Sequence, residues 1–331
     1  MNLKMKFIGN LIKDVVSTTL LCGFGLAAFE GWSQTSTVDF TNQSPTAMVD
    51  IKAQFAANEA AAKDGDAKIL FELARAYDHG LGVTRDPAKA AEYAKQAAEK
   101  DYPPAETLLG SYYGRGFGVP KNPGQALQWY RKAADQGYAL AQLALGGFYQ
   151  SGTGVPRDWE QAIAWLTKAA DQDNAAAQCQ LGLIYFNGGL SGDTNHVNYP
   201  EAVKWLKKSA DHGYIGAMNN LGLAYIYGLG GLKVDPVTAE KWLRQAAEKG
   251  SANAQASLGL LYADGAQGVP ANPVEAYVWL SLSARGGNVE GKHTAKEIAA
   301  NLSPAEQERA NEMIKYYDEH HNAPVQTRGE Q

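Results

Sequence analysis

The chain has little of what metal, disulfide and nucleic-acid chemistry requires. Its 331 residues include two cysteines and six scattered histidines, and 30 Lys and Arg face 35 Asp and Glu, a formal charge of −5. Phosphate binding depends on clustered Lys and Arg, so this acidic balance argues against a nucleic-acid partner. G-x-S-x-G, Walker, H-E-x-x-H and C-x-x-C motifs are also missing from the sequence. We therefore expect a protein that is not an enzyme and has no cofactor and no metal site.

The N-terminal segment carries an apolar run that predicts export. Two early lysines precede the run Val15–Phe29, and small residues lie near Ser33. This order is typical of a cleavable signal peptide, so residues 1–33 are predicted to be removed before Gln34, or alternatively after Ala28. The run is short for a full membrane span, which makes an uncleaved anchor the less favoured alternative. We expect a periplasmic or secreted protein with no stable membrane span after cleavage.

What the sequence contains is one helix-turn-helix unit repeated about six times. One tyrosine recurs at intervals of 36, 36, 36, 40 and 37 residues, at Tyr77, Tyr113, Tyr149, Tyr185, Tyr225 and Tyr262. A Leu-Gly pair keeps the same phase at Leu109-Gly110, Leu145-Gly146, Leu181-Gly182, Leu221-Gly222 and Leu258-Gly259. The first copy has Leu73-Ala74 in that place. An internal period of this size predicts an all-α solenoid.

Each copy carries the signals of two packed helices. The recurring glycine, Gly110 in the clearest copy, falls inside the first helix, where glycine costs about 1 kcal/mol relative to alanine. Its recurrence predicts the close approach of a neighbouring helix. An Asn-Pro or Asp-Pro pair opens several second helices. The second helices share an aromatic position that we expect in the core: Tyr93, Trp129, Trp165, Trp205, Trp242 and Trp279. Trp159 lies outside this phase, so we expect it to tolerate truncation better than Trp205.

The repeated motif resembles that of a known family. The pattern A-x-x-x-L-G-x-x-Y-x-x-G-x-G-V, followed by A-x-x-W and K-A-A-x-x-G, is clearest in Ala105–Leu140. It is similar to the Sel-one-like repeat, a relative of the tetratricopeptide repeat, over residues 67–290. The resemblance implies a right-handed α/α solenoid that scaffolds protein complexes and, in bacteria, is often exported.

A cysteine-rich branch of the same family has a disulfide in each repeat, and some of its members are associated with β-lactam binding or hydrolysis. This chain departs from that branch, because Cys179 is its single cysteine after the predicted cleavage. A cell-envelope hydrolase or a cell-wall or β-lactam-binding protein is therefore kept as the alternative function.

The segments around the six repeats are predicted as a flexible linker at 34–48, an N-terminal capping helix at 49–66, C-terminal capping helices at 291–319 and a disordered tail at 320–331. Terminal units of a solenoid are atypical because one of their sides faces water. The fourth copy carries an insertion at Gly188–Tyr199. It is expected to be a solvated loop, and a partner contact there is the alternative.

Function is expected on the positions that vary between the copies. The first helices of related solenoids line a concave surface, and positions four, seven and eleven of each copy fall opposite the fixed residues on a helical wheel. Amides and tyrosine there suit a protein or peptide partner, or a glycan, through hydrogen bonds and stacking. The predicted partner-binding residues are Arg115, Gln180, Asn187, Asn220, Tyr227 and Asp264. The oligomeric state is left open by the sequence.

Overall fold

The structure is a computed structural model that describes residues 45–187 and 197–320, and within these ranges it contains helices and no β-strand. It divides into two units, of which the first ends at Gln180 and the second begins at Leu181. The predicted signal peptide, most of the predicted linker, residues 188–196 of the insertion and the tail from residue 321 lie outside the described residues.

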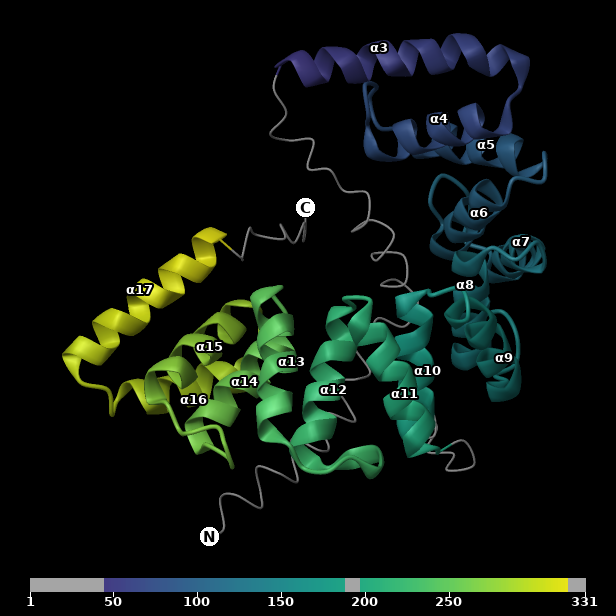
Figure 1. Ribbon diagram of the computed structural model, residues 1–331. Helices are drawn as coiled ribbons and strands as arrows, with labels where there is room; N and C mark the ends of the chain where they lie inside the picture. The colour runs from purple at the N-terminus through teal and green to yellow at the C-terminus, as the bar shows by residue number, and fades with distance from the viewer. Residues whose placement is uncertain (1–44, 188–196, 321–331) are drawn as a thin grey trace. The chain divides into compact units, whose positions relative to one another are not determined.

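The first unit is a row of helical hairpins preceded by one longer helix (Figure 1). Hairpins form between α4 and α5, α6 and α7, and α8 and α9. The helices of this unit are α3 (Pro45–Ala61), α4 (Ala67–His79), α5 (Pro87–Ala98), α6 (Pro103–Arg115), α7 (Pro123–Asp135), α8 (Ala139–Ser151) and α9 (Trp159–Ala170). A short 3-10 turn, η3 (Ala62–Asp64), joins α3 to α4, and α10 (Ala175–Asn187) crosses the boundary between the units.

The second unit continues the same alternation. Its hairpins pair α12 with α13 and α14 with α15. Its helices are α11 (Tyr199–Asp211), α12 (Ile215–Tyr227), α13 (Pro236–Glu248), α14 (Ala252–Asp264), α15 (Pro273–Arg285), α16 (Val289–Ala299) and α17 (Pro304–His320), with a 3-10 turn η5 (Leu229–Gly231). The predicted all-α helix-turn-helix solenoid is therefore confirmed.

Helix ends follow the predicted capping signals. Asp86 opens α5 by accepting hydrogen bonds from the backbone N–H groups of Ala88 and Lys89, both at 3.1 Å. Asn122 caps α7 in the same way, from the N–H of Gln125 at 3.1 Å. A proline follows each of these caps, where its missing N–H costs nothing. Local sequence signals therefore determine where these two second helices begin.

The recurring glycine of the first helix is required by packing. A Cβ at Gly146 would lie 2.5 Å from Cγ of Leu166 on the second helix of the same repeat. At Gly222 the corresponding distance, to Cγ of Leu243, is 2.7 Å. Since Cβ atoms do not approach other atoms so closely, the missing side chain lets the two helices of a repeat come together. The predicted close approach is confirmed, and the leucine after the aromatic position fills the space.

The first repeat keeps the same packing with two small residues. Ala74 replaces the glycine, and Ala94 stands at the position that Tyr130 and Leu166 hold in the next two repeats. Both alanines are fully buried. The methyl group of Ala74 is accommodated because the opposing side chain is a methyl group as well.

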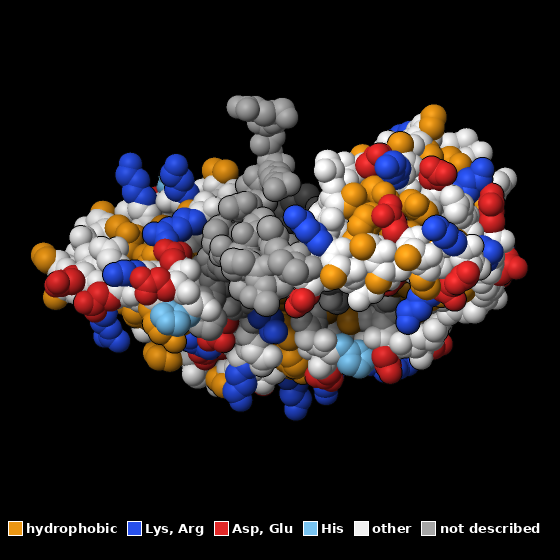
Figure 2. Space-filling model, turned by 90° about the horizontal axis from the view of Figure 1, so that it is seen from above, with side chains coloured by type: hydrophobic (Ala, Val, Ile, Leu, Met, Phe, Trp, Pro, Cys, Tyr) orange, Lys and Arg blue, Asp and Glu red, His pale blue; other side chains and the backbone are white. Residues whose placement is uncertain are grey.

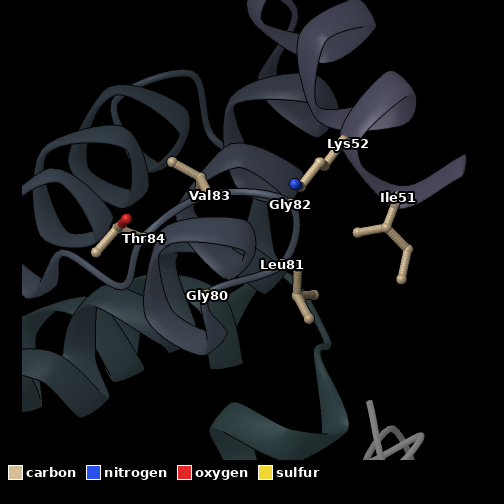
Figure 3. A pocket seen from close by; sticks show the side chains of 7 residues that line it. All are labelled: Ile51, Lys52, Gly80, Leu81, Gly82, Val83 and Thr84. Atoms are coloured by element: carbon tan, nitrogen blue, oxygen red, sulfur yellow. The ribbon is translucent and has the colours of Figure 1, made fainter. Parts of the chain in front are cut away.

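Helix α3 takes the place of a second helix in front of the first repeat. In the following repeats, a turn glycine lies against the start of the preceding second helix, and a Cβ at Gly154 would meet the carbonyl of Pro123 at 3.1 Å. In the first repeat Gly82 lies in the same way against α3, with its Cβ position 2.8 Å from the carbonyl oxygen of Ile51. Figure 3 shows Ile51 and Lys52 of α3 facing this turn across a cavity of about 480 Å³.

The start of α3 corrects the predicted linker. The helix begins at Pro45, so the last residues of the 34–48 linker are helical. The reason is visible in the sequence, because Ser44-Pro45 is another cap-and-proline start signal. The side chains of Gln54 and Asn58 on α3 bond to each other at 2.9 Å, at the positions where α5 has the buried Ala90 and Ala94.

At the other end, α16 and α17 follow the last repeat. A capping box opens α17, with Ser303 N–H donating to Glu306 at 2.8 Å and Glu306 N–H donating to Ser303 Oγ at 3.4 Å. Tyr317 of α17 packs on the fully buried Trp279 with ring centres 4.6 Å apart. This contact holds α17 against α15.

The aromatic position of the second helices is only partly core. Trp165, Trp205 and Trp279 are buried, whereas the other three aromatic residues of the set are half-buried. The expectation for Trp159 was wrong, because its exposed fraction is 8%, against 7% for Trp205. Trp159 is the first residue of α9 and stands where α7 has Pro123. In the earlier copies, the turn of the following repeat covers this position, as Gly154 covers Pro123.

Candidate partner-binding site

Three of the predicted partner-binding residues lie in the second unit. Tyr227 and Asp264 are the last residues of α12 and α14, the first helices of two successive repeats. Tyr227 is half-buried and Asp264 is exposed. Burial and, secondly, the nearby charge of Asp264 raise the pKa of the Tyr227 hydroxyl. The phenol is therefore neutral at ordinary pH and can donate a hydrogen bond beside a carboxylate.

Asn220 extends this surface along α12. It is half-buried and lies seven residues before Tyr227, so both side chains project from the same face of the helix. The adjacent Asn219 is 3.4 Å from the hydroxyl of Ser257 on α14, which shows how closely the two first helices approach. We call Asn220, Tyr227 and Asp264 the amide-tyrosine surface.

The other three predicted residues are placed differently. Arg115 belongs to the first unit, is exposed at the end of α6, and has its guanidinium 5.5 Å from the centre of the Phe117 ring. Gln180 is half-buried on α10, and its Oε1 has no hydrogen-bond partner among the described residues. Asn187 ends α10, and its side chain lies outside the described residues.

The variable face is narrower than the helical wheel predicted. Leu108 and Ser111 are buried in α6, and Leu223 is buried in α12. These are positions four and seven of their copies, which were expected to face outward. Each first helix packs on its own second helix and on neighbouring repeats, so the position next to the terminal glycine remains the more accessible one. The helix ends are therefore the more accessible part of the variable face, and half-buried residues such as Asn220 extend it along the helix.

Sequence reasoning missed a recurring buried glutamine near the start of the first helices. The side-chain amides of Gln142, Gln178 and Gln255 donate to backbone carbonyls eight residues earlier, at 3.2, 3.0 and 3.1 Å. Each bond adds a donor to a carbonyl at the end of the preceding helix, which also accepts a backbone N–H from the turn that follows. The recurrence of glutamine at the same repeat position, which Met218 holds in the fifth repeat, was a signal that the sequence contained.

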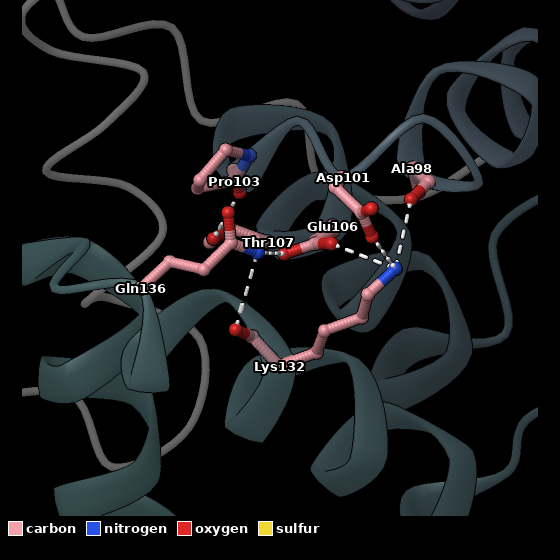
Figure 4. Close-up of polar contacts among 7 residues, drawn as sticks. All are labelled: Ala98, Asp101, Pro103, Glu106, Thr107, Lys132 and Gln136. Atoms are coloured by element: carbon pink, nitrogen blue, oxygen red, sulfur yellow. Dashed lines mark hydrogen bonds and ion pairs between the residues drawn. The ribbon is translucent and has the colours of Figure 1, made fainter.

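Glu106 replaces this glutamine in the second repeat, and Figure 4 shows the result. Its carboxylate is fully buried, with Oε1 3.0 Å from Lys132 Nζ and Oε2 accepting a 2.7 Å hydrogen bond from Gln136. Lys132 also donates to the carbonyl of Ala98 at 3.3 Å, the bond that a glutamine amide would make. Lys132 further pairs with Asp101 at 2.6 Å.

The electrostatics of this cluster are those of a structural ion pair. Burial raises the pKa of Glu106, and the hydrogen bond and charge of Lys132 oppose that rise. The hydrogen bond to Asp101 raises the pKa of Lys132. Because the carboxylate is enclosed and both of its oxygens are engaged, the cluster offers no group to a substrate.

Metal chemistry adds no further site among the described residues. Basic and acidic side chains are interspersed on the faces seen in Figure 2. Within the described ranges, no group of three His, Cys, Asp or Glu side chains is arranged to hold a metal ion, and Cys179 is buried and forms no disulfide. None of the helices in residues 45–187 and 197–320 combines the length and apolar character that a membrane crossing requires.

Comparison with known proteins explains the repeat. The model of the Sel1 repeat family matches six consecutive segments, residues 68–102, 103–138, 139–174, 175–214, 215–251 and 252–288. The chain belongs to the Sel1 repeat family. Each Sel1 repeat matched here contains one helical hairpin, and the Sel1 solenoid is generally a protein-interaction scaffold.

Two solved structures of Sel1 repeat proteins are similar to this chain. One is c5321, a protective antigen of uropathogenic Escherichia coli strains with an SLR fold, at 32% identity and a TM-score of 0.75 over 85% of this chain. The match spans 61% of c5321, so this chain covers about three fifths of that protein's length. The other, a Sel1 repeat protein from Oxalobacter formigenes, is 28% identical with a TM-score of 0.60, over 66% of this chain and 85% of the other. Among curated proteins, none matches the chain.

Proposed function

We propose that this Sel1 repeat protein is an exported, non-enzymatic adaptor that binds a protein or peptide segment on the amide-tyrosine surface of its second unit. The observation that carries the proposal is the convergence of Tyr227 and Asp264 from successive repeats, with Asn220 on the same helix face. Fixed residues such as Leu221 and Leu258 are fully buried and build the repeats, whereas Asn220 and Tyr227 are half-buried and Asp264 is exposed. An amide, a phenol and a carboxylate together can pair with both N–H and C=O groups of an extended backbone.

A peptide library displayed on phage and selected against the purified full chain tests this surface. Selected peptides should bind the double variant Asn220→Ala with Tyr227→Ala about tenfold or more weakly, as expected when a hot-spot residue is lost. Ser151→Ala is the matched control, since Ser151 holds the Tyr227 position in the third repeat and is exposed. Circular dichroism and the melting temperature establish that each variant remains folded. Unchanged binding by a folded double variant would place the partner elsewhere.

Export is the second part of the proposal. It is supported by the apolar N-terminal run, and the similar protein c5321 is described as a protective antigen. N-terminal sequencing of the mature protein should begin near Gln34 or just after Ala28. A mature protein that still begins at Met1 and stays in the cytoplasm contradicts this part alone.

A further inference from the structure

Two arginines from different repeats of the first unit lie against one aromatic ring. Phe117 is in the turn after α6, and the Arg115 guanidinium carbon is 5.5 Å from the centre of its ring. Arg85, from the turn of the preceding repeat, places its guanidinium carbon 5.1 Å from the same centre. Each distance is within the range of a cation–π contact. The ring therefore holds two positive charges close together on an acidic chain.

The neighbouring Asp78 carboxylate pairs only loosely with Arg85. Arg85 Nε donates to the backbone carbonyl of Asp78 at 2.7 Å, and its other contact with Asp78, to the carboxylate, is a longer 3.9 Å. The Asp78 carboxylate accepts a 2.8 Å hydrogen bond from the fully buried Tyr112, which orients it toward the core. A guanidinium has five N–H donors, and the Arg85 side chain is 59% exposed, so donors remain for a ligand.

The position of Arg85 is basic in three successive repeats. Lys121 and Arg157 follow it at intervals of 36 residues, and all three side chains are exposed. The corresponding residues of the last two repeats, in the second unit, are Val234 and Ala271. The first unit thus carries a row of cations along its turns, and the two corresponding positions named in the second unit are uncharged.

We propose that this row, with Arg115 at its first step, binds an extended acidic peptide segment. An extended chain advances about 3.3 Å per residue, so acidic side chains placed at intervals along the ligand can meet successive cations of the row. Arginine is suited to this role because its planar fork bonds both oxygens of a carboxylate. The row belongs to the first unit, whereas the amide-tyrosine surface belongs to the second, so the two proposals stand or fall separately.

Fluorescence anisotropy with a labelled peptide of four Glu-Gly-Ser units tests the proposal on the full chain. The peptide should bind at low salt, more weakly as salt rises, and more tightly than the same peptide with glutamine in place of glutamate. The double variant Arg85→Ala with Arg115→Ala should bind it at least tenfold more weakly. Lys207→Ala with Lys233→Ala is the matched control, because it removes two exposed cations of the second unit, and it should change binding less than twofold.

Several results would overturn the proposal. The first is that the glutamate peptide does not bind. The second is that the control variant weakens binding as much as the arginine variant, because the attraction would then be unspecific. Tighter binding of a twelve-nucleotide single-stranded DNA would assign the row to phosphates. If Arg85→Ala disturbs folding through its bond to Asp78, the variant Lys121→Ala with Arg157→Ala replaces it, and binding within twofold of wild type again contradicts the proposal.

Discussion

Replacing Glu106 by glutamine should stabilise the protein, although the change removes a buried ion pair. In the third repeat the amide of Gln142 bonds the Ala134 carbonyl at 3.2 Å, and its Oε1 accepts a 2.8 Å bond from Gln172. A glutamine at position 106 can make both bonds, to the Ala98 carbonyl and from Gln136. The variant therefore keeps every polar atom paired and buries no charge.

The magnitude depends on what happens to Lys132. Its side chain is 40% exposed and keeps Asp101 at 2.6 Å, so the substitution does not leave it as an uncompensated buried charge. A neutral hydrogen bond contributes about 1 kcal/mol net, and replacing a buried ion pair by well-matched neutral groups is often stabilising by about 1–4 kcal/mol. We expect a gain near the lower end, about 1 kcal/mol, because Lys132 and Gln136 already satisfy Glu106.

The gain should depend on pH in a defined direction. Burial raises the pKa of Glu106 in the folded protein above its ordinary value of 4.5, so the folded state holds this proton more tightly than the unfolded state. The favourable contribution of the protonated carboxyl is present below pH 4.5 and is lost as pH rises through the raised folded pKa. The stability difference between Glu106→Gln and wild type should thus be small near pH 4 and largest at neutral pH.

Thermal and urea unfolding followed by circular dichroism at pH 4 and pH 7.5 measures this difference. Gln142→Glu is the reciprocal control, because a carboxylate there faces the Ala134 carbonyl and Lys168 lies over the Trp165 ring, 3.9 Å from its centre. It should cost about 1–3 kcal/mol as a buried group without its bond. Lys132→Met should cost about 3 kcal/mol in wild type and much less beside Glu106→Gln.

The reasoning fails if Glu106→Gln is as damaging as Lys132→Met. It also fails if the gain at pH 7.5 persists unchanged at pH 4, since the benefit would then not come from removing the buried charge.

Three further outcomes are expected, two from the packing and one from the proposed non-enzymatic function. Gly146→Ala should destabilise the protein by about 1–3 kcal/mol through overpacking. Gly147→Ala, whose Cβ meets open space, should stabilise it by about 0.5–1 kcal/mol in the same melting experiment. Equal effects of the two substitutions would contradict the glycine packing described above. Trp159→Ala and Trp205→Ala should each cost about 3–5 kcal/mol, and a mild effect of the first alone would contradict its burial. The purified protein should not turn over nitrocefin; turnover that survives repurification would favour the hydrolase alternative.

The repeat and its helix boundaries could be predicted from the sequence, because they depend on local signals. The Leu-Gly pairs, the recurring tyrosines and the Asp-Pro and Asn-Pro caps report which face of a helix is buried and where that helix begins. Even the start of α3 at Pro45, which the linker prediction overran, has such a signal.

The candidate site was only partly within reach of the sequence. The phase correctly indicated that the helix-terminal position is accessible, as the exposed Arg115 and Asp264 show, but it also counted Ser111 and Leu223 as outward-facing, and both are buried. A helical wheel considers one helix at a time. Whether the side chains at positions four and seven are buried depends on the other helices that pack around that helix.

Contacts between elements were decided by the tertiary structure. Periodicity cannot tell that Lys132 of α7 reaches both Glu106 of α6 and the Ala98 carbonyl of α5, nor that Arg85 meets Phe117 of the next repeat. Local sequence determines the face that a residue occupies. Which atoms fill the space opposite that face depends on how separate helices pack, and that arrangement exists only in the folded chain.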